Sequence, residues 1–95
     1  MKIKTNYSLN FERKKGKQRK IKFIIIHYTG MQSERESVQR LCSSESKVSS
    51  HYIINKKGNI LRLVEDQNIA WHAGKSSWGN EKNLNKNSIG IELVN

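Results

Sequence analysis

The chain has 95 residues, which fits one small domain, and it carries 18 Lys and Arg against 8 Asp and Glu, a formal charge of +10. This charge favours polyanionic partners such as nucleic acid, anionic lipid or an acidic wall polymer. The single cysteine, Cys42, excludes an intrachain disulfide, and no apolar run reaches the length of a signal peptide or of a membrane span. We therefore expect a soluble, unexported domain.

The first 20 residues predict a basic, flexible arm ahead of a domain that spans residues 21–95. Within this arm the run ERKKGKQRK, at residues 12–20, holds six Lys or Arg around a glycine and has no apolar face that a helix could bury. Such a run is either a solvated charge cluster or a contact for nucleic acid.

The stretch KFIIIHYTG, residues 22–30, predicts a strand that is buried on both faces. Four apolar, mostly β-branched residues run directly into a histidine and a Thr-Gly turn signal. His27 therefore stands at the end of this strand. A histidine at such a position is either a hydrogen-bonded core residue or a metal ligand, since open α/β sheets place ligands at strand ends.

The segment after this strand predicts a short helix. Val38, Leu41 and Cys42 fall at the i, i+3, i+4 spacing that makes one apolar stripe on a helix. Ser33 stands three residues before Glu36, which is the pattern of a capping box at a helix N-terminus. The charged residues of the segment are then expected to face water.

The stretch SSHYIINKKGNILRLV predicts a β-hairpin with strands at about residues 50–55 and 59–64. The strands are joined by Asn-Lys-Lys-Gly, in which Gly58 can adopt the left-handed conformation that a tight turn needs. His51 alternates with Tyr52 along the first strand, and we expect a hydrogen-bonded structural role for it.

Residues 65–86 show neither helical nor strand periodicity and contain two Trp, two Gly and many Asn and Ser. They predict a long loop, and a loop of this length in a compact domain is usually functional or disordered. His72, in the sequence AWHAG, is there either a structural residue or a polar contact to a ligand.

The last stretch, SIGIELVN, predicts another strand, in which apolar residues alternate with Gly90, Glu92 and Val94. A lone carboxylate among Ile, Leu and Val is costly to bury unless it is paired or has a task. Burial would raise the proton affinity of Glu92, which suits a general base. The alternative is that the face carrying Gly90 and Glu92 is open to water.

The three histidines, His27, His51 and His72, form no local zinc motif, because the intervals between them match no finger or His-x-x-x-His arrangement. Composition, periodicity and spacing therefore lead only to a small α/β sheet with a polar site at its strand ends, and they name no substrate.

Four motifs taken together are more specific than any one of them. In order and at near-expected intervals, FIIIHYTG, VSSHYIINKKGNILRLV, IAWHAGKSSWG and NLNKNSIGIELVN resemble the zinc-dependent N-acetylmuramoyl-L-alanine amidases of the AmpD and AmiD type. This superfamily also includes phage lysin amidases and peptidoglycan recognition proteins. The resemblance covers about residues 20–95 and implies an α/β fold, a mixed β-sheet flanked by helices with a zinc site at its edge.

The resemblance implies cleavage of the amide bond between N-acetylmuramic acid and L-alanine in peptidoglycan or its fragments, by water that zinc activates. His27 matches a zinc ligand of the family, and Glu92 matches the acid that takes and relays a proton. Trp71 and His72 resemble part of the substrate groove wall, together with the 73–79 loop, and Asn95 falls where the strand end meets the peptide in the family. These roles rest on the resemblance alone.

The chain departs from the family pattern in one respect. The other zinc ligands of the family, a histidine and then Asp or Cys, and a lysine that helps stabilise the transition state, all lie downstream of the strand that matches residues 88–94. A catalytic zinc needs three protein ligands, so His27 alone cannot hold one. We therefore expect the N-terminal part of an amidase domain, truncated, with a fold that lacks the helices covering one face.

Two other functions stay open. A non-catalytic module that binds peptidoglycan or muropeptides would keep Trp71, His72 and Trp78 without a complete metal site. A basic nucleic-acid binder rests on charge alone, since the basic run holds no interleaved aromatic residue. A cytoplasmic location is expected from the absence of an export signal, with a periplasmic or cell-wall location as the alternative. The oligomeric state stays open.

Overall fold

The structure is a computed structural model that describes residues 3–14, 18–31, 33–73, 77–78 and 81–94. These residues form a mixed α/β arrangement, as the sequence predicts. Its helices are α1 (Glu34–Cys42) and the short 3-10 helix η1 (Leu84–Asn87). Its strands are β1 (Ile3–Thr5), β2 (Phe11–Glu12), β3 (Phe23–Tyr28), β4 (Tyr52–Ile54), β5 (Ile60–Arg62), β6 (Ile69–Ala70), β7 (Ser77–Trp78), β8 (Glu81–Lys82) and β9 (Ser88–Leu93).

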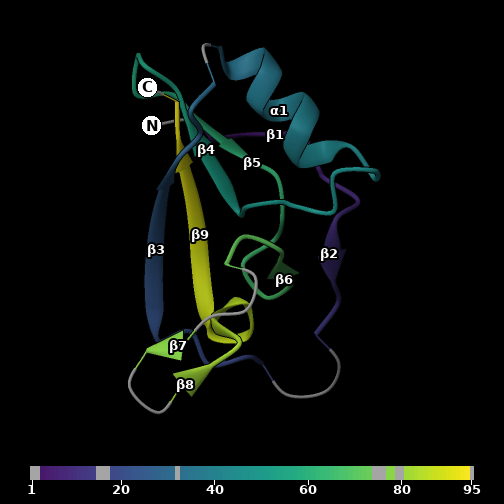
Figure 1. The fold of residues 1–95 in the computed structure, drawn as a ribbon, viewed down its shortest axis with the longest axis vertical. Helices are drawn as coiled ribbons and strands as arrows, with labels where there is room; N and C mark the ends of the chain where they lie inside the picture. Colours follow the sequence, from purple (N-terminus) through teal and green to yellow (C-terminus); the bar gives the residue numbers. More distant parts are fainter. Residues whose placement is uncertain (1–2, 15–17, 32, 74–76, 79–80, 95) are drawn as a thin grey trace.

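The main sheet has five strands in the order β1-β5-β4-β9-β3 (Figure 1). The pairs β1–β5, β4–β9 and β3–β9 are parallel, and the hairpin pair β4–β5 is antiparallel, which makes the sheet mixed. The last strand, β9, therefore lies inside the sheet, between β4 and β3. Two small antiparallel pairs, β2–β6 and β7–β8, lie outside it.

The register of β3 and β9 sets up the site. His27 is the direct partner of Glu92, and Glu92 also pairs with Ile53 of β4. Directly paired residues of neighbouring strands point to the same face of a sheet. Since Ile53 is fully buried, this face is the inner one, and the side chains of His27 and Glu92 both point toward it.

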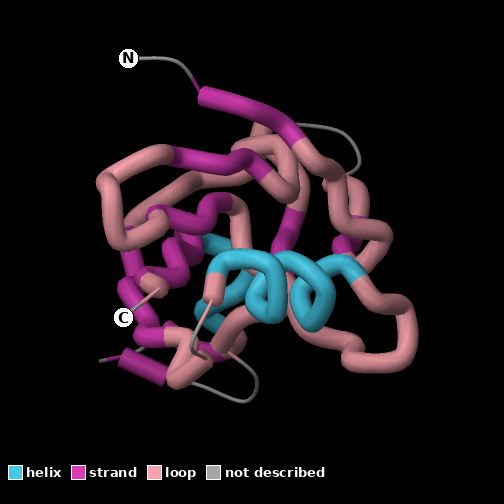
Figure 2. The backbone as a smooth tube through the Cα atoms, turned by 90° about the horizontal axis from the view of Figure 1, so that it is seen from above, coloured by secondary structure: helices cyan, strands magenta, loops and turns pink. Residues whose placement is uncertain are grey.

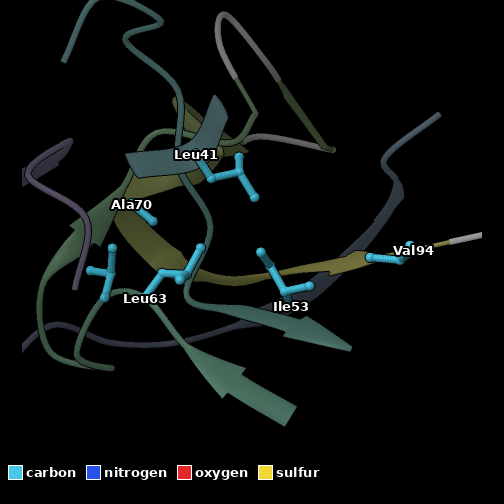
Figure 3. Packing of buried hydrophobic residues seen from close by; sticks show 6 residues of the cluster. Leu41, Ile53, Leu63, Ala70 and Val94 are labelled. Atoms are coloured by element: carbon cyan, nitrogen blue, oxygen red, sulfur yellow. The ribbon is translucent and has the colours of Figure 1, made fainter. Parts of the chain in front are cut away.

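Helix α1 packs on the inner face of the sheet, beside the strands when the molecule is seen from above (Figure 2). The Ser33 hydroxyl caps it by accepting a hydrogen bond from the Glu36 backbone N–H at 3.2 Å, which confirms the predicted cap. The buried apolar cluster combines one residue of α1, one residue each of β4 and β6, and residues that follow β5 and β9 (Figure 3). Its members are Leu41, Ile53, Leu63, Val64, Ala70 and Val94.

The hairpin is also confirmed. The backbone N–H of Gly58 donates to the Asn55 carbonyl at 2.9 Å, and Gly58 has φ +84°, the left-handed conformation that the turn requires. The side-chain oxygen of Asn55 accepts hydrogen bonds from the backbone N–H groups of Lys57 and Asn59. The predicted Asn-Lys-Lys-Gly turn is therefore held by its own first residue.

The segment expected to be a basic, flexible arm pairs with distant strands over its described residues, 3–14 and 18–20, although most of these residues are exposed. Strand β1 pairs with β5 and strand β2 pairs with β6, and Ser8, Asn10 and Arg19 are buried. The reason is that a short strand forms wherever a partner strand is available for hydrogen bonding. The partners here lie 55 residues or more further along the chain, and no local sequence pattern indicates them. The basic residues Arg13, Lys14 and Lys20 are exposed.

Two further predictions about burial and loops need correction. Strand β3 is an edge strand, and the residues on its outer face are exposed, Ile24 by 67%, Ile26 by 57% and Tyr28 by 69%. It is therefore not buried on both faces by the described part of the chain. The expected long loop at 65–86 contains β6, β7, β8 and η1 as well as irregular segments. Within the described ranges, no helix has the length and apolar character to cross a membrane.

Candidate functional site

A cleft of about 270 Å³ lies between the inner face of the sheet and helix α1. His27 and Glu92 line it from β3 and β9, and Trp71 and His72 line it from the segment after β6. The remaining lining residues are Tyr28, Thr29, Met31, Ser37, Arg40, Leu41, Val48 and Ser49. Four residues that the resemblance singles out therefore lie together although 65 positions of the chain separate the first from the last.

The imidazole rings of His27 and His72 are in direct contact. His27 Nε2 lies 3.2 Å from His72 Nδ1, and the two rings meet edge to face with centroids 5.4 Å apart. The other nitrogen of His72, Nε2, lies 2.9 Å from the Ser88 hydroxyl oxygen. His72 is therefore engaged at both ring nitrogens, once by a strand of the sheet and once by the residue that starts the neighbouring strand.

Burial, first of all, and then the electrostatic influence of His27, His51 and Arg19 together lower the pKa of His72 to about 3. The imidazole is therefore neutral at physiological pH. A neutral imidazole has one N–H donor and one acceptor nitrogen, so the two contacts of His72 are of opposite kinds.

Gly90 of β9 lies directly under the His72 ring. A Cβ atom placed on Gly90 would lie 2.5 Å from both Cγ and Cδ2 of that ring, a distance that side chains do not tolerate. The absence of a side chain at Gly90 therefore lets the imidazole lie close against β9. The sequence pattern alone indicated only that Gly90 shares a face with Glu92.

Backbone contacts hold the segment after β6 in place. The side-chain oxygen of Asn85 accepts hydrogen bonds from the backbone N–H groups of His72 at 3.1 Å and Ala73 at 2.8 Å. On the other side, the Trp71 N–H donates to the Ser49 hydroxyl and the Trp71 carbonyl accepts from the Ser49 N–H, both at 2.9 Å. Trp71 and His72 thus enter the cleft from a segment that is fixed at three successive residues.

Glu92 is half-buried beside His27. Burial raises the pKa of the Glu92 carboxyl, and the charges of His27 and Arg40 oppose this rise. The direction agrees with the expectation from the apolar strand. A carboxyl with a raised pKa takes up a proton more readily, which is the property that a general base and a subsequent acid need.

His51 is fully buried and its two ring nitrogens are occupied. Nδ1 accepts a hydrogen bond from the Gly90 N–H at 3.0 Å, and Nε2 lies 2.9 Å from the Asn68 carbonyl oxygen and 2.9 Å from Nη2 of Arg19. Burial lowers the pKa of His51, which keeps the ring neutral. This agrees with the hydrogen-bonded structural role expected from the sequence and leaves no ring nitrogen of His51 for a metal.

The residues of the cleft do not make a complete zinc site. Within the described ranges no group of three or more His, Cys, Asp or Glu side chains could hold a metal ion. His27 supplies an imidazole at the cleft, whereas His51 is fully engaged elsewhere and His72 faces His27 and Ser88. The described residues therefore fit one zinc ligand of the set that the resemblance implies.

Several residues in and around the cleft were not predicted from the sequence. Ser37 and Arg40 reach the cleft from α1, where they share a helix face with Leu41, so the helical stripe was the available signal. Ser49 and Ser88 had no signal, because their roles depend on distant partners. Asn95, expected to meet the peptide, lies outside the described residues.

Comparisons with known proteins match this chain to one family of enzymes. The N-acetylmuramoyl-L-alanine amidase family matches residues 17–95. The amidase AmiD of Escherichia coli K12 is 42% identical over 83 residues, which are 80% of this chain and 29% of AmiD. A solved complex of E. coli AmiD with the substrate anhydro-N-acetylmuramic acid-L-Ala-D-γ-Glu-L-Lys is similar with a TM-score of 0.71 and 37% identity, covering 88% of this chain and 34% of the other.

A solved structure of a selenomethionine derivative of AmpD superimposes with a TM-score of 0.84 at 22% identity, covering 98% of this chain and 61% of that one. At this identity the likeness shows the fold alone. The chain thus spans less than a third of the length of AmiD and under two thirds of the AmpD chain.

Proposed function

The chain belongs to the N-acetylmuramoyl-L-alanine amidase family, and on this premise we propose that its cleft serves the hydrolysis of the amide bond between N-acetylmuramic acid and the L-alanine of the peptidoglycan stem peptide. The observation that carries the proposal is the direct pairing of His27 with Glu92 on the floor of a cleft that Trp71 and His72 also line. A potential metal ligand and a potential base thus lie side by side.

In this proposal Glu92 is the catalytic acid and base. It accepts a proton from the attacking water and returns it to the leaving amine of L-alanine, and its raised pKa supports the second half of that task. Trp71 and His72 form the wall against which the substrate lies, and Asn95 contacts the peptide. Glu92→Gln is expected to abolish cleavage while leaving muropeptide binding largely intact.

Zinc belongs to the same proposal, with His27 as one ligand and the other ligands supplied from beyond residue 95. When bound, zinc lowers the pKa of a water molecule and polarises the amide carbonyl. The other ligands are a histidine and an Asp or Cys near a lysine, as the family resemblance implies. Reading the coding sequence after residue 95 for these residues tests this part directly.

A second candidate function is a module that binds muropeptides without cutting them. It is favoured by one observation: among the residues that the structure describes, the ligands present do not complete a metal site although the cleft is formed. A binding module requires the cleft and its aromatic wall, but it does not require zinc or a base.

The first experiment measures zinc content, amide cleavage and muropeptide binding on chain 1–95 and on a chain extended by its downstream coding sequence. We expect both chains to bind muropeptide, and the extended chain to hold one zinc and to cleave, with both properties lost in His27→Ala. Binding without cleavage by the zinc-loaded extended chain would favour the binding module. A folded chain that binds no muropeptide would contradict both functions.

A cytoplasmic location is the last part of the proposal, with muropeptide fragments rather than intact wall as substrate. It is supported by the lone Cys42, a free thiol packed against the core that needs no oxidising compartment. Cell fractionation with an antibody against the chain tests it, and recovery from the periplasm or the cell wall would contradict it.

A further inference from the structure

We propose that His72 is a positioning residue, which fixes both the orientation of the His27 ring and the nitrogen on which that ring carries its proton. The inference rests on the proposed function in one respect, that His27 is the residue to be positioned. The contacts run in a line from the Leu84 carbonyl through the Ser88 hydroxyl and the His72 ring to His27.

The Leu84 carbonyl determines which atom donates and which accepts at each contact in this line. The Ser88 hydroxyl lies 2.6 Å from the Leu84 carbonyl oxygen, which can only accept, so the single hydroxyl hydrogen points to Leu84. The oxygen of Ser88 then faces His72 Nε2 with lone pairs at 2.9 Å. This contact is favourable only if Nε2 of His72 carries the ring proton and donates it.

The second step follows from this placement of the His72 proton. An uncharged imidazole that carries its proton on Nε2 has a lone pair on Nδ1, and the atom 3.2 Å from that nitrogen is Nε2 of His27. That atom must therefore be the protonated nitrogen of His27, and it donates to His72. Nδ1 of a neutral His27 is left with the lone pair that a metal ligand or proton acceptor requires.

The surroundings of His72 keep its ring from turning over, which would exchange the positions of its two nitrogens. Gly90 lies under the ring with no room for a methyl group, and Asn85 holds the backbone of His72 at 3.1 Å. A rigid partner of this kind keeps a histidine in one ring orientation and one tautomer. His72 thus acts on the site through His27, in addition to lining the cleft.

The test is a long-range ¹H–¹⁵N NMR experiment on metal-free chain 1–95 at alkaline pH, where imidazoles are neutral. We expect His27 in the wild-type chain with Nε2 protonated and Nδ1 unprotonated. His72→Ala removes the acceptor, and Ser88→Ala lets His72 change tautomer. In both variants the nitrogen signals of His27 are expected to move toward each other as the two tautomers mix.

Ser50→Ala is the matched control, since Ser50 is also fully buried and its hydroxyl donates at 2.9 Å to a backbone carbonyl, that of Tyr52, and not to a histidine ring. It should leave the His27 signals unchanged. A wild-type His27 protonated on Nδ1, or His27 signals that are the same in wild type, His72→Ala and Ser88→Ala, would overturn the proposal. Because no substrate or zinc is present, this outcome is independent of whether the chain binds muropeptide or cleaves it.

Discussion

At Gly90 the addition of one methyl group forces a choice between the sheet and the His72 ring. The new Cβ in Gly90→Ala would lie 2.5 Å from two ring atoms, so either β9 or the ring must shift. We expect a loss of about 1–3 kcal/mol in the free energy of unfolding, the range for overpacking a well-filled interior. Urea unfolding followed by circular dichroism measures it.

The double variant Gly90→Ala/His72→Ala is the control for this mechanism. If the clash with the ring is the cause, removing the ring relieves it, and the double variant loses clearly less stability than the two single losses added together. Additive losses would show that Gly90 matters for another reason, such as the backbone of β9.

His72 also makes the fold sensitive to acid. Its pKa of about 3 in the folded chain lies below the ordinary value of 6.5 that it regains on unfolding. The unfolded chain therefore binds a proton between these two values and the folded chain does not, so stability is present above about pH 6.5 and is lost as the pH falls toward 3. The lowered pKa of His51 acts in the same direction.

We expect the urea midpoint of the wild-type chain to fall steadily between these pH values, and the fall to be shallower in His72→Asn, whatever the starting stability of that variant. The slope against pH is the quantity to compare. Equal slopes in the two chains would contradict a neutral, buried His72.

Among the elements, the segment before β3 is tied down by one side chain. Arg19 is 6% exposed, and its guanidinium donates to the carbonyls of Asp66 at 2.7 Å and of Asn85 and Lys86 at 3.3 Å. Burial lowers the pKa of Arg19, yet the fork of donors satisfies two distant segments at once. This residue links the N-terminal segment to η1 and to the turn after β5.

Arg19→Lys is expected to lose about 1–3 kcal/mol in the free energy of unfolding, because an ammonium cannot reach all three carbonyls and leaves buried acceptors without donors. Thermal unfolding measures the loss. Lys20→Ala, which removes an exposed neighbouring charge, is the control and should change little. A similar effect of both substitutions would mean that the loss does not come from the hydrogen bonds of the Arg19 guanidinium.

The elements that could be predicted from the sequence are those with local signals. Helix α1 has its cap at Ser33 and its apolar stripe, and the hairpin has Gly58, so both could be predicted. Strands β1 and β2 could not, since their partners β5 and β6 are distant in sequence and their residues are largely polar. The contact of His27 with His72 spans 45 positions, and no spacing rule connects the two.

The sequence also does not tell which face of a strand is buried. A period of two identifies which residues share a face, but it does not tell which face is covered. In β9 the face with Ser88 and Gly90 is the buried one, and Ile89 and Ile91 on the other face are half-buried. The inner face holds small and polar residues because it seats His72 and borders the cleft.

At the scale of the whole molecule, the outer face of the edge strand β3 is an exposed apolar surface. Ile24, Ile26 and Tyr28 are exposed on β3, next to the outward residues of β9. We expect chain 1–95 to bind the dye ANS and to self-associate as its concentration rises, because contiguous exposed apolar surface does both. Fluorescence titration and sedimentation velocity measure these properties.

Ile24→Thr/Ile26→Thr should lower both the dye signal and the self-association while retaining the strand, since threonine keeps the β-branched shape. Leu9→Thr removes an exposed apolar side chain elsewhere and serves as the control. If the control lowers the signal as much as the double variant does, the outer face of β3 is not the surface responsible.

The place of β9 in the sheet also has a consequence for the order in which the protein folds. Both β3 and β4 use β9 as a neighbour, and β3 must wait about 60 residues of chain for it. Strand pairs this far apart in sequence form slowly, because the entropy of closing a long loop is lost before the contacts that compensate for it have formed. During synthesis on the ribosome, the hairpin β4–β5 can therefore form early, whereas His27 acquires its neighbour Glu92 only after β9 has been made.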